Sequence, residues 1–179
     1  MFDLEPGTTT MSRLVSGVQD EHLALRTPCS DWTVADLLAH VHQFTSVFTT
    51  NAAKAAADPP QSLVDDWRTA IPTALGQLAS AWQDESAWQG KTSAGGVEMD
   101  AADNALVAME ELTVHGWDLA RATGQQASAT DDQLDRVDSF FELFGGAPFG
   151  PPTEPPADAD RLARTIARTG RDPQWRSQH

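Results

Sequence analysis

The longest uninterrupted helical pattern of the chain runs from Asp100 through Thr123 and ends directly before Gly124. About 24 residues at roughly 1.5 Å each give a helix about 36 Å long, which matches the height of a helix bundle. Gly124 stands where helices often end, because glycine adopts left-handed backbone angles without a steric penalty. A helix of this length has to bury one side against other elements, and this requirement limits the possible folds.

Five shorter segments also show helical signals, and three of them begin with a capping box. In a capping box, a Thr or Ser side chain binds the backbone of the first turn, and a side chain three residues later binds back. Thr33, Ser62 and Thr130 each begin such a pattern. The sequence therefore predicts helices over about 10–25, 33–57, 62–85, 130–144 and 157–169.

Signals for β-strands are almost absent. The stretch 86–99 is broken by three glycines and is interpreted as a loop. We expect one domain over residues 1–179, in which residues 145–179 form a loop rich in Gly and Pro, a short helix and a tail that ends in His179. The predicted fold class is all-α, built on a four-helix bundle with additional short C-terminal helices.

The chain is strongly acidic, with 26 Asp and Glu against 12 Lys and Arg and a formal net charge of −14. A field of this sign repels nucleic acid and anionic lipid, so neither is an expected partner. No apolar run reaches the roughly 18 residues of a membrane span, and the first residues show no secretory signal. The one cysteine, Cys29, excludes an internal disulfide and a cysteine-based zinc cluster. We therefore expect a cytoplasmic protein.

Two histidines on the second predicted helix point in different directions. His40 and His42 are two residues apart, which places them about 200° apart around the helix. His40 shares its face with Phe44 and Val47, an apolar stripe, and is expected to point inward. His42 lies on a more polar face and is expected to point outward. A core histidine satisfied by one hydrogen bond also fits His40, so its position alone does not make it a ligand.

The long helix carries a polar strip with apolar residues on both sides. Glu111 and His115 are four residues apart and therefore lie on one face. Asn104 and Asp118 lie near them around the helix, and valines and leucines flank the strip. Such a strip is typical of a polar seam inside a bundle, and an exposed Glu–His pair is the alternative.

Imidazoles and a carboxylate are ordinary ligands for Zn²⁺ and related divalent ions, and catalytic zinc sites keep one position open beside three protein ligands. His40, Glu111 and His115 are therefore candidate metal ligands. Asp118 either orients an imidazole N–H or forms an ion pair with Arg121. The E-x-x-x-H spacing alone is common on helices, so the hypothesis needs further support.

Two nearby residues are weaker candidates for chemistry. Glu110 lies about 140° from His115 around the helix and is a poorer ligand. Cys29 precedes a helix start, which can lower the pKa of a thiol, but a small buried thiol is the favoured interpretation.

The same residues carry a resemblance to a known family. TPCSDWTVADLLAHV, which contains His40, resembles the opening motif of the DinB/YfiT-like metalloprotein superfamily, and within it the mycothiol-dependent maleylpyruvate isomerase N-terminal-domain type. EELTVHGWDLARATG, which contains Glu111 and His115, resembles the second motif of that group. APFGPP and TGRDPQW are similar to the closing signature of a single-domain subgroup. The resemblance spans nearly the whole chain.

Imidazole and carboxylate ligands accept Zn²⁺, Ni²⁺ or Fe²⁺. The resemblance implies a DinB-like four-helix bundle that holds a divalent metal ion, often zinc, through His40, Glu111 and His115. It also implies a low-molecular-weight thiol, such as mycothiol or bacillithiol, as cosubstrate, because a metal ion favours the thiolate form. The isomerase has a further domain after its bundle, so its own activity is not expected to carry over.

Two functions remain open at this point. We favour a metal- and thiol-dependent S-transferase or isomerase acting on a small electrophile. The alternative is a metal-binding or protein-interaction module without turnover. A homodimer that forms through apolar helix faces is plausible in either case.

Overall fold

The computed structural model describes residues 1–29, 31–146 and 149–177, and His179 lies outside them. The described part contains six α-helices: α1 (Glu5–Ser16), α2 (Val34–Ala52), α3 (Trp67–Ala81), α4 (Ala101–Ala122), α5 (Asp131–Phe144) and α6 (Arg161–Arg168). It also contains two short 3₁₀ turns and one small hairpin, formed by β1 (Lys91–Ala94) and β2 (Val97–Asp100). The predicted all-α fold class is confirmed.

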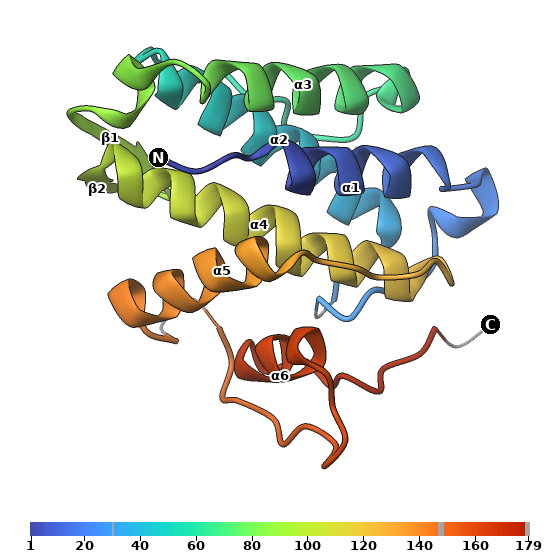
Figure 1. Ribbon diagram of the computed structural model, residues 1–179. Coiled ribbons are helices and arrows are strands. Elements are labelled where there is room, and N and C mark those ends of the chain that lie inside the picture. The colour runs from blue at the N-terminus through green and yellow to red at the C-terminus, as the bar shows by residue number, and fades with distance from the viewer. Residues whose placement is uncertain (30, 147–148, 178–179) are drawn as a thin grey trace.

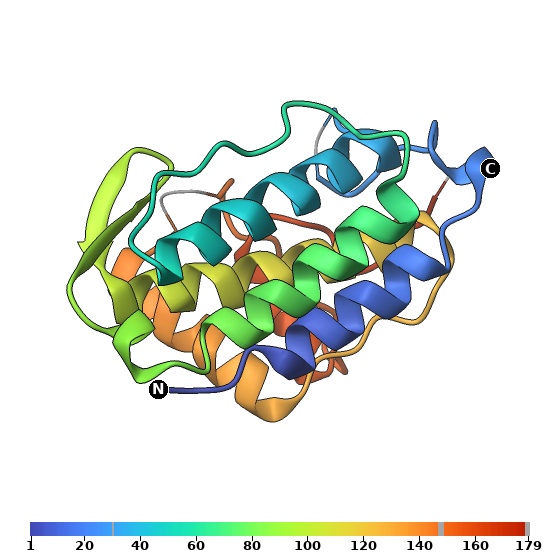
Figure 2. The same ribbon diagram turned by 90° about the horizontal axis from the view of Figure 1, so that it is seen from above.

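The first four helices form the bundle. α1 and α2 each pack against both α3 and α4, so the four helices enclose one apolar core. The view from above shows α1, α2 and α3 lying over α4 (Figure 2). α5 packs on the outer side of α4, and α6 packs on α5 below it (Figure 1). α4 is therefore the central helix, and most of its residues are buried.

Local sequence signals fix several helix ends. Thr33 and Thr130 form the predicted capping boxes at the starts of α2 and α5. α4 ends as predicted, because Gly124 adopts a φ of 69° and the Gln125 N–H then donates to the carbonyl of Ala120 over 2.9 Å. These ends set the register of the two helices that carry the polar strip and His40.

The predicted loop over 86–99 is wrong in part, because it contains the hairpin. β1 and β2 are antiparallel, with Lys91 opposite Asp100 and Ala94 opposite Val97. Gly95 and Gly96 have φ values of 55° and 79°, as a two-residue hairpin turn of type I′ requires. Gly95 and Gly96, which were interpreted as breakers, thus form the turn of a hairpin. The sequence did not predict the hairpin, because each strand has only four residues and little alternation of apolar and polar side chains.

Other helix boundaries also differ from the prediction. α1 begins at Glu5 instead of near residue 10, because a proline in its first turn starts the helix. α2 ends at Ala52, short of residue 57. The Ser62 box does not start α3, which begins at Trp67 without a side-chain cap. α6 begins after the cap Asp160, later than residue 157.

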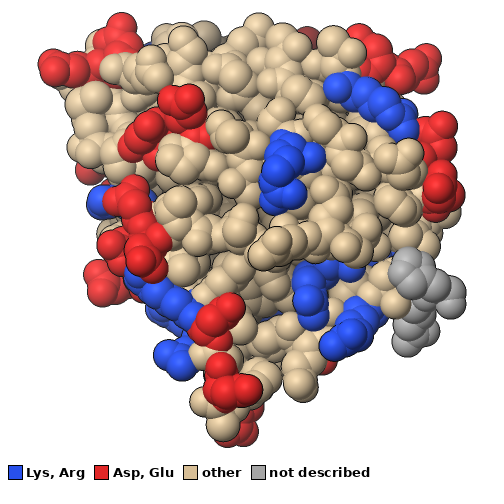
Figure 3. Space-filling view, turned by 45° about the vertical axis from the view of Figure 1, so that its right-hand side comes forward, with Lys and Arg blue, Asp and Glu red and all other residues tan. Residues whose placement is uncertain are grey.

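The C-terminal segment, residues 149–177 of the described chain, folds back beneath α4 and α5 (Figure 1). Arg161 of α6 forms ion pairs with Asp135 and Asp138 of α5 at 2.5 and 2.9 Å. Figure 3 shows that acidic side chains gather at the edges of one face, whereas uncharged residues and a few separate basic side chains occupy its centre. Within the described residues, none of the helices is long and apolar enough to cross a membrane.

Candidate metal centre

Three side chains from α2 and α4 converge inside the bundle. His40 reaches from α2, and Glu111 and His115 reach from adjacent turns of α4. Oε2 of Glu111 lies 3.1 Å from Nε2 of His40 and 3.2 Å from Nε2 of His115. The structure therefore brings together the three residues that the sequence analysis selected, which we call the triad (His40, Glu111 and His115).

The triad is partly accessible. The side chains of His40 and Glu111 are 23% and 22% exposed, and that of His115 is 10% exposed. Trp32, just before α2, packs against both imidazoles, with ring centroids 4.9 Å from His40 and 5.8 Å from His115. The indole of Trp32 thus covers one side of the triad, and solvent reaches the carboxylate of Glu111.

A chain of polar contacts extends from the triad to the C-terminal segment. Nδ1 of His115 donates to Oδ2 of Asp118 over 2.9 Å. Asp118 is fully buried and accepts two further hydrogen bonds, from Nε and Nη2 of Arg171 at 2.7 and 2.8 Å. The bond to Asp118 turns Nε2 of His115 toward Glu111 and requires a proton on Nδ1.

Of the two roles predicted for Asp118, the structure shows the contact with an imidazole N–H. The alternative ion pair with Arg121 is wrong. Arg121 instead donates to the carbonyls of Trp175 and Pro173 at 3.0 and 3.2 Å. Both arginines therefore tie the C-terminal segment to α4, but only Arg171 reaches the polar strip.

The two adjacent glutamates are in opposite electrostatic environments. Burial alone would raise the pKa of Glu111, but hydrogen bonds from His115 and His40 outweigh it and hold that pKa well below its usual range. Burial raises the pKa of Glu110, and the charge of Glu111 raises it further. Burial opposes the charged form of His115, but its bonds to Asp118 and Glu111 outweigh it and raise its pKa to about 10. Glu111 is thus the anionic centre of the site.

The donor set fits a divalent ion. The ligand atoms of the triad all lie within 4.8 Å of one another, and two imidazoles with one carboxylate form a common zinc ligand set. A second group, Cys29 with His115 and Asp118, meets the same distance limit. It fits less well, because Asp118 is already bound by Arg171 and burial raises the pKa of the Cys29 thiol.

Comparison with known proteins places this geometry in a family. The family model for the mycothiol maleylpyruvate isomerase N-terminal domain matches residues 4–120, which is more than half of the chain. The chain belongs to this family. Uncharacterized proteins from two strains of Mycobacterium tuberculosis are 29% identical over 172 residues, which cover 88% of this chain and 91% of the relative.

Two crystal structures of a mycothiol-dependent maleylpyruvate isomerase, one of them a histidine-to-alanine mutant, show the same fold. Their TM-scores are 0.55 and 0.56, with 20% and 19% identity over 73% of this chain. The aligned part spans 63% of the length of those structures. The matched family domain ends at residue 120, so it contains the triad and Asp118, and Arg171 lies beyond it.

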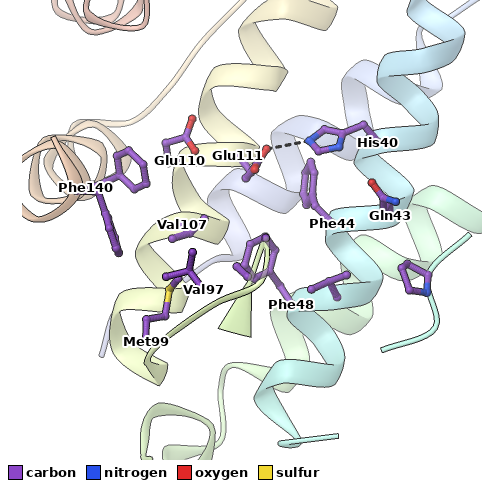
Figure 4. Close-up of a pocket in the computed structure, with 15 residues that line it drawn as sticks. His40, Gln43, Phe44, Phe48, Val97, Met99, Val107, Glu110, Glu111 and Phe140 are labelled. Atoms are coloured by element: carbon purple, nitrogen blue, oxygen red, sulfur yellow. Dashed lines mark hydrogen bonds and ion pairs between the residues drawn. The ribbon is translucent and has the colours of Figure 1, made fainter. Parts of the chain in front are cut away.

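Two cavities meet at Glu110 and Glu111, which line both of them. The apolar cavity has a volume of about 520 Å³ and includes among its lining residues His40, Phe44, Phe48, Val107, Phe140 and Phe144 (Figure 4). The polar cavity has a volume of about 360 Å³ and includes Cys29, Trp32, His115, Phe149, Gly150 and Arg171. The triad thus stands between two spaces of different character.

Other predicted features are placed as follows. His42 lies on α2 outside the triad, as predicted, but it is half-buried instead of pointing outward. Its Nδ1 is buried and has no hydrogen-bond partner among the described residues, and burial lowers its pKa. Cys29 is half-buried and lines the polar cavity, so the interpretation as a small buried thiol holds only in part.

Sequence reasoning missed three residues of the site: Trp32, Glu110 as a cavity residue, and Arg171. Trp32 lies two residues before the start of α2, and Arg171 lies 53 residues after Asp118. Arg171 lies in TGRDPQW, which the sequence analysis compared with the closing signature of the subgroup. A local sequence pattern does not predict which buried acid an arginine will contact.

Proposed function

We propose that this chain binds one divalent metal ion through His40, Glu111 and His115, and uses a low-molecular-weight thiol of the mycothiol type to modify a small electrophile. Zinc is the first choice of metal, and nickel and iron are alternatives. The observation that carries the proposal is the convergence of three donor atoms at the point where two cavities meet. Membership in the mycothiol maleylpyruvate isomerase N-terminal domain family supports the choice of thiol.

The residues of the chain have separate tasks in this proposal. Asp118 holds the Nδ1 proton of His115, so a metal ion that displaces the proton on Nε2 meets a nitrogen lone pair directed toward the centre. Arg171 neutralises Asp118, and Glu111 supplies the anionic oxygen. A divalent ion held there lowers the pKa of a thiol that binds to it and favours the thiolate at neutral pH. The two cavities leave room for a thiol and an electrophile beside the triad.

Metal analysis of purified protein tests the first half of the proposal. We expect about one equivalent in the wild type and a loss of most of it in His40→Ala and in His115→Ala. His42→Ala is the matched control, because it removes the same side chain from the same helix outside the triad, and it should retain the metal. Equal metal content in all four proteins would contradict the site.

Initial rates test the second half. Mycothiol, bacillithiol and glutathione would each be offered with 1-chloro-2,4-dinitrobenzene. The sulfur forms a bond to the ring carbon, chloride leaves with the electron pair of the broken C–Cl bond, and solvent takes the thiol proton. We expect a saturable rate with at least one thiol that is lost in Glu111→Ala and retained in His42→Ala. Bound metal without any thiol-dependent rate would favour the alternative of a metal-binding module.

Three further features belong to the same proposal. We place the protein in the cytoplasm, where small thiols are kept reduced. Residues 1–179 act as one domain, since Arg171 and Arg161 bind α4 and α5. A homodimer is the proposed assembly, and light scattering of the purified protein would test it.

A further inference from the structure

The apolar cavity is a slot between two pairs of phenylalanines. Phe44 and Phe48 lie one turn apart on α2, with ring centroids 6.2 Å apart. Phe140 and Phe144 repeat this arrangement on α5, with centroids 5.1 Å apart. Figure 4 shows Phe140 approaching from the α5 side and Phe44 and Phe48 from the α2 side, with Val107 of α4 between them. Flat aromatic walls of this kind favour a flat apolar guest.

The cavity is formed in advance of any ligand. Phe44, Phe48 and Phe140 are only 4%, 2% and 3% exposed, because each also packs into the protein core. Val97 of the hairpin also lines the cavity and is 60% exposed. A guest that enters would remove part of this valine from water without rearranging the walls, and both effects favour binding.

The charges around the cavity are of one sign. Eleven of its fifteen lining residues are apolar or glycine, and the two carboxylates among the rest are Glu110 and Glu111. Among the described residues that line it, none is a lysine or an arginine. Arg171 lines the polar cavity instead. An anionic guest would lose its water shell between these phenylalanines without gaining a counter-charge from the side chains along the slot, and a metal ion held by the triad would stand only at its Glu111 end.

The volume sets the size of the guest. About 520 Å³ falls within the range of roughly 300–1,000 Å³ that is common for small-molecule sites. A molecule of up to three aromatic rings fits such a space. The polar cavity of about 360 Å³ has an arginine to meet a polar or anionic molecule.

We propose that the apolar cavity binds the electrophile and that this electrophile is an uncharged, apolar molecule of up to three aromatic rings, not a carboxylate. That the bound molecule is an electrophile rests on the proposed function, whereas its uncharged and apolar character rests on the cavity alone. The reacting atom lies at the Glu111 end of the slot, where His40 and Glu111 close it. The polar part of the thiol lies in the polar cavity, near Arg171.

Two fluorescent probes with the same ring system test the assignment on the protein of residues 1–179 as it is purified. N-phenyl-1-naphthylamine is neutral, and 8-anilinonaphthalene-1-sulfonate adds one negative charge to the same skeleton. We expect the neutral probe to bind at least about tenfold more tightly than the sulfonate. Equal affinities, or tighter binding of the sulfonate, would overturn the proposal.

Variants locate the binding. Val47→Arg places a cation on the wall of the cavity and should weaken the neutral probe and strengthen the sulfonate, so that the preference shrinks or reverses. Ala56→Arg adds the same charge at an exposed position after α2 and should change neither affinity. Val47→Trp, which fills the slot without charge, should weaken both probes, and circular dichroism confirms that each variant is folded. Unchanged binding in both Val47 variants would place the probes elsewhere and overturn the assignment.

Metal analysis of the same samples separates this proposal from the proposed function. Metal present but no preference for the neutral probe would overturn the apolar electrophile and leave the metal site standing. Preferential binding of the neutral probe with no metal in any sample would support the apolar cavity and overturn the metal-dependent function.

Discussion

The bundle and the C-terminal segment contribute to the same site in different ways. The bundle supplies all three members of the triad from α2, which begins at the Thr33 capping box, and α4, which ends before Gly124. The C-terminal segment supplies no member of the triad. It supplies Arg171, which holds Asp118, and with Phe149 and Gly150 it forms a wall of the polar cavity.

The candidate donor atoms and the arginine behind them thus come from different parts of the chain. The matched family domain ends at residue 120, so the donor atoms lie inside it and the Arg171 contact lies outside it. A change in the bundle at the triad should therefore remove the metal outright. A change in the C-terminal segment should leave the donors in place and alter how firmly His115 is oriented. The predictions below test this division.

The largest effect is expected from Asp118→Ala, because Asp118 binds His115 of the bundle and Arg171 of the C-terminal segment. The change removes the acceptor for Nδ1 of His115 and leaves the largely buried Arg171 without its counter-charge. We expect a loss of about 3–5 kcal/mol in unfolding free energy and a metal affinity lowered about 10–100-fold. Urea denaturation and competition with a chelator measure the two quantities. Asp103→Ala, a half-buried acid of the same helix, should cost less than about 1 kcal/mol.

Arg171→Ala should have the next largest effect and reports on the C-terminal segment alone. Two charge-assisted hydrogen bonds are lost, but Asp118 keeps its bond from His115, so we expect a loss of about 1.5–3 kcal/mol. Arg121→Ala is the control: it breaks two bonds to carbonyls of the same segment without touching Asp118. If both variants lower metal affinity equally, the segment acts by general packing and the division fails.

Gly170→Ala should disturb the position of Arg171 through the backbone. Gly170 has a φ of 77°, and a Cβ there would lie 3.0 Å from the carbonyl oxygen of Pro151. Gly124 has a similar φ of 69° with open space around it. We expect Gly170→Ala to cost about 2 kcal/mol and Gly124→Ala about 1 kcal/mol, because only the first adds a clash to the backbone strain. Similar melting temperatures for the two variants would contradict a steric clash between a side chain at position 170 and the backbone of Pro151.

The smallest effect on the site is expected from Thr33→Ala. It removes the cap of α2 and should cost about 1 kcal/mol of stability, as should Thr130→Ala at the cap of α5. Neither change should alter metal content, because the triad lies turns away from both caps. A drop in metal content in Thr33→Ala alone would show that the donors depend on bundle stability, which would weaken the comparison between the two regions.

The sequence predicted the parts of the site that depend on helical register. The spacing of Glu111 and His115 places both on one face of α4, and the apolar stripe around His40 turns it toward that face. The fold class followed from the same periodicity. Arg171 and the hairpin did not follow, for different reasons: Arg171 acts across 53 residues of chain, and the hairpin depends on two glycines whose neighbours carry weak strand signals. Local patterns specify local geometry, and a contact made by a returning chain end is not local.

The adjacent glutamates at the boundary between the two cavities have a kinetic consequence. A molecule in the slot of phenylalanines and a molecule beside Arg171 occupy separate spaces, so neither has to leave before the other enters. Two reactants arranged in this way form a ternary complex, and double-reciprocal plots of initial rate at several fixed thiol concentrations would then intersect instead of running parallel. The order of arrival would be free, and the rate would depend on both concentrations at once.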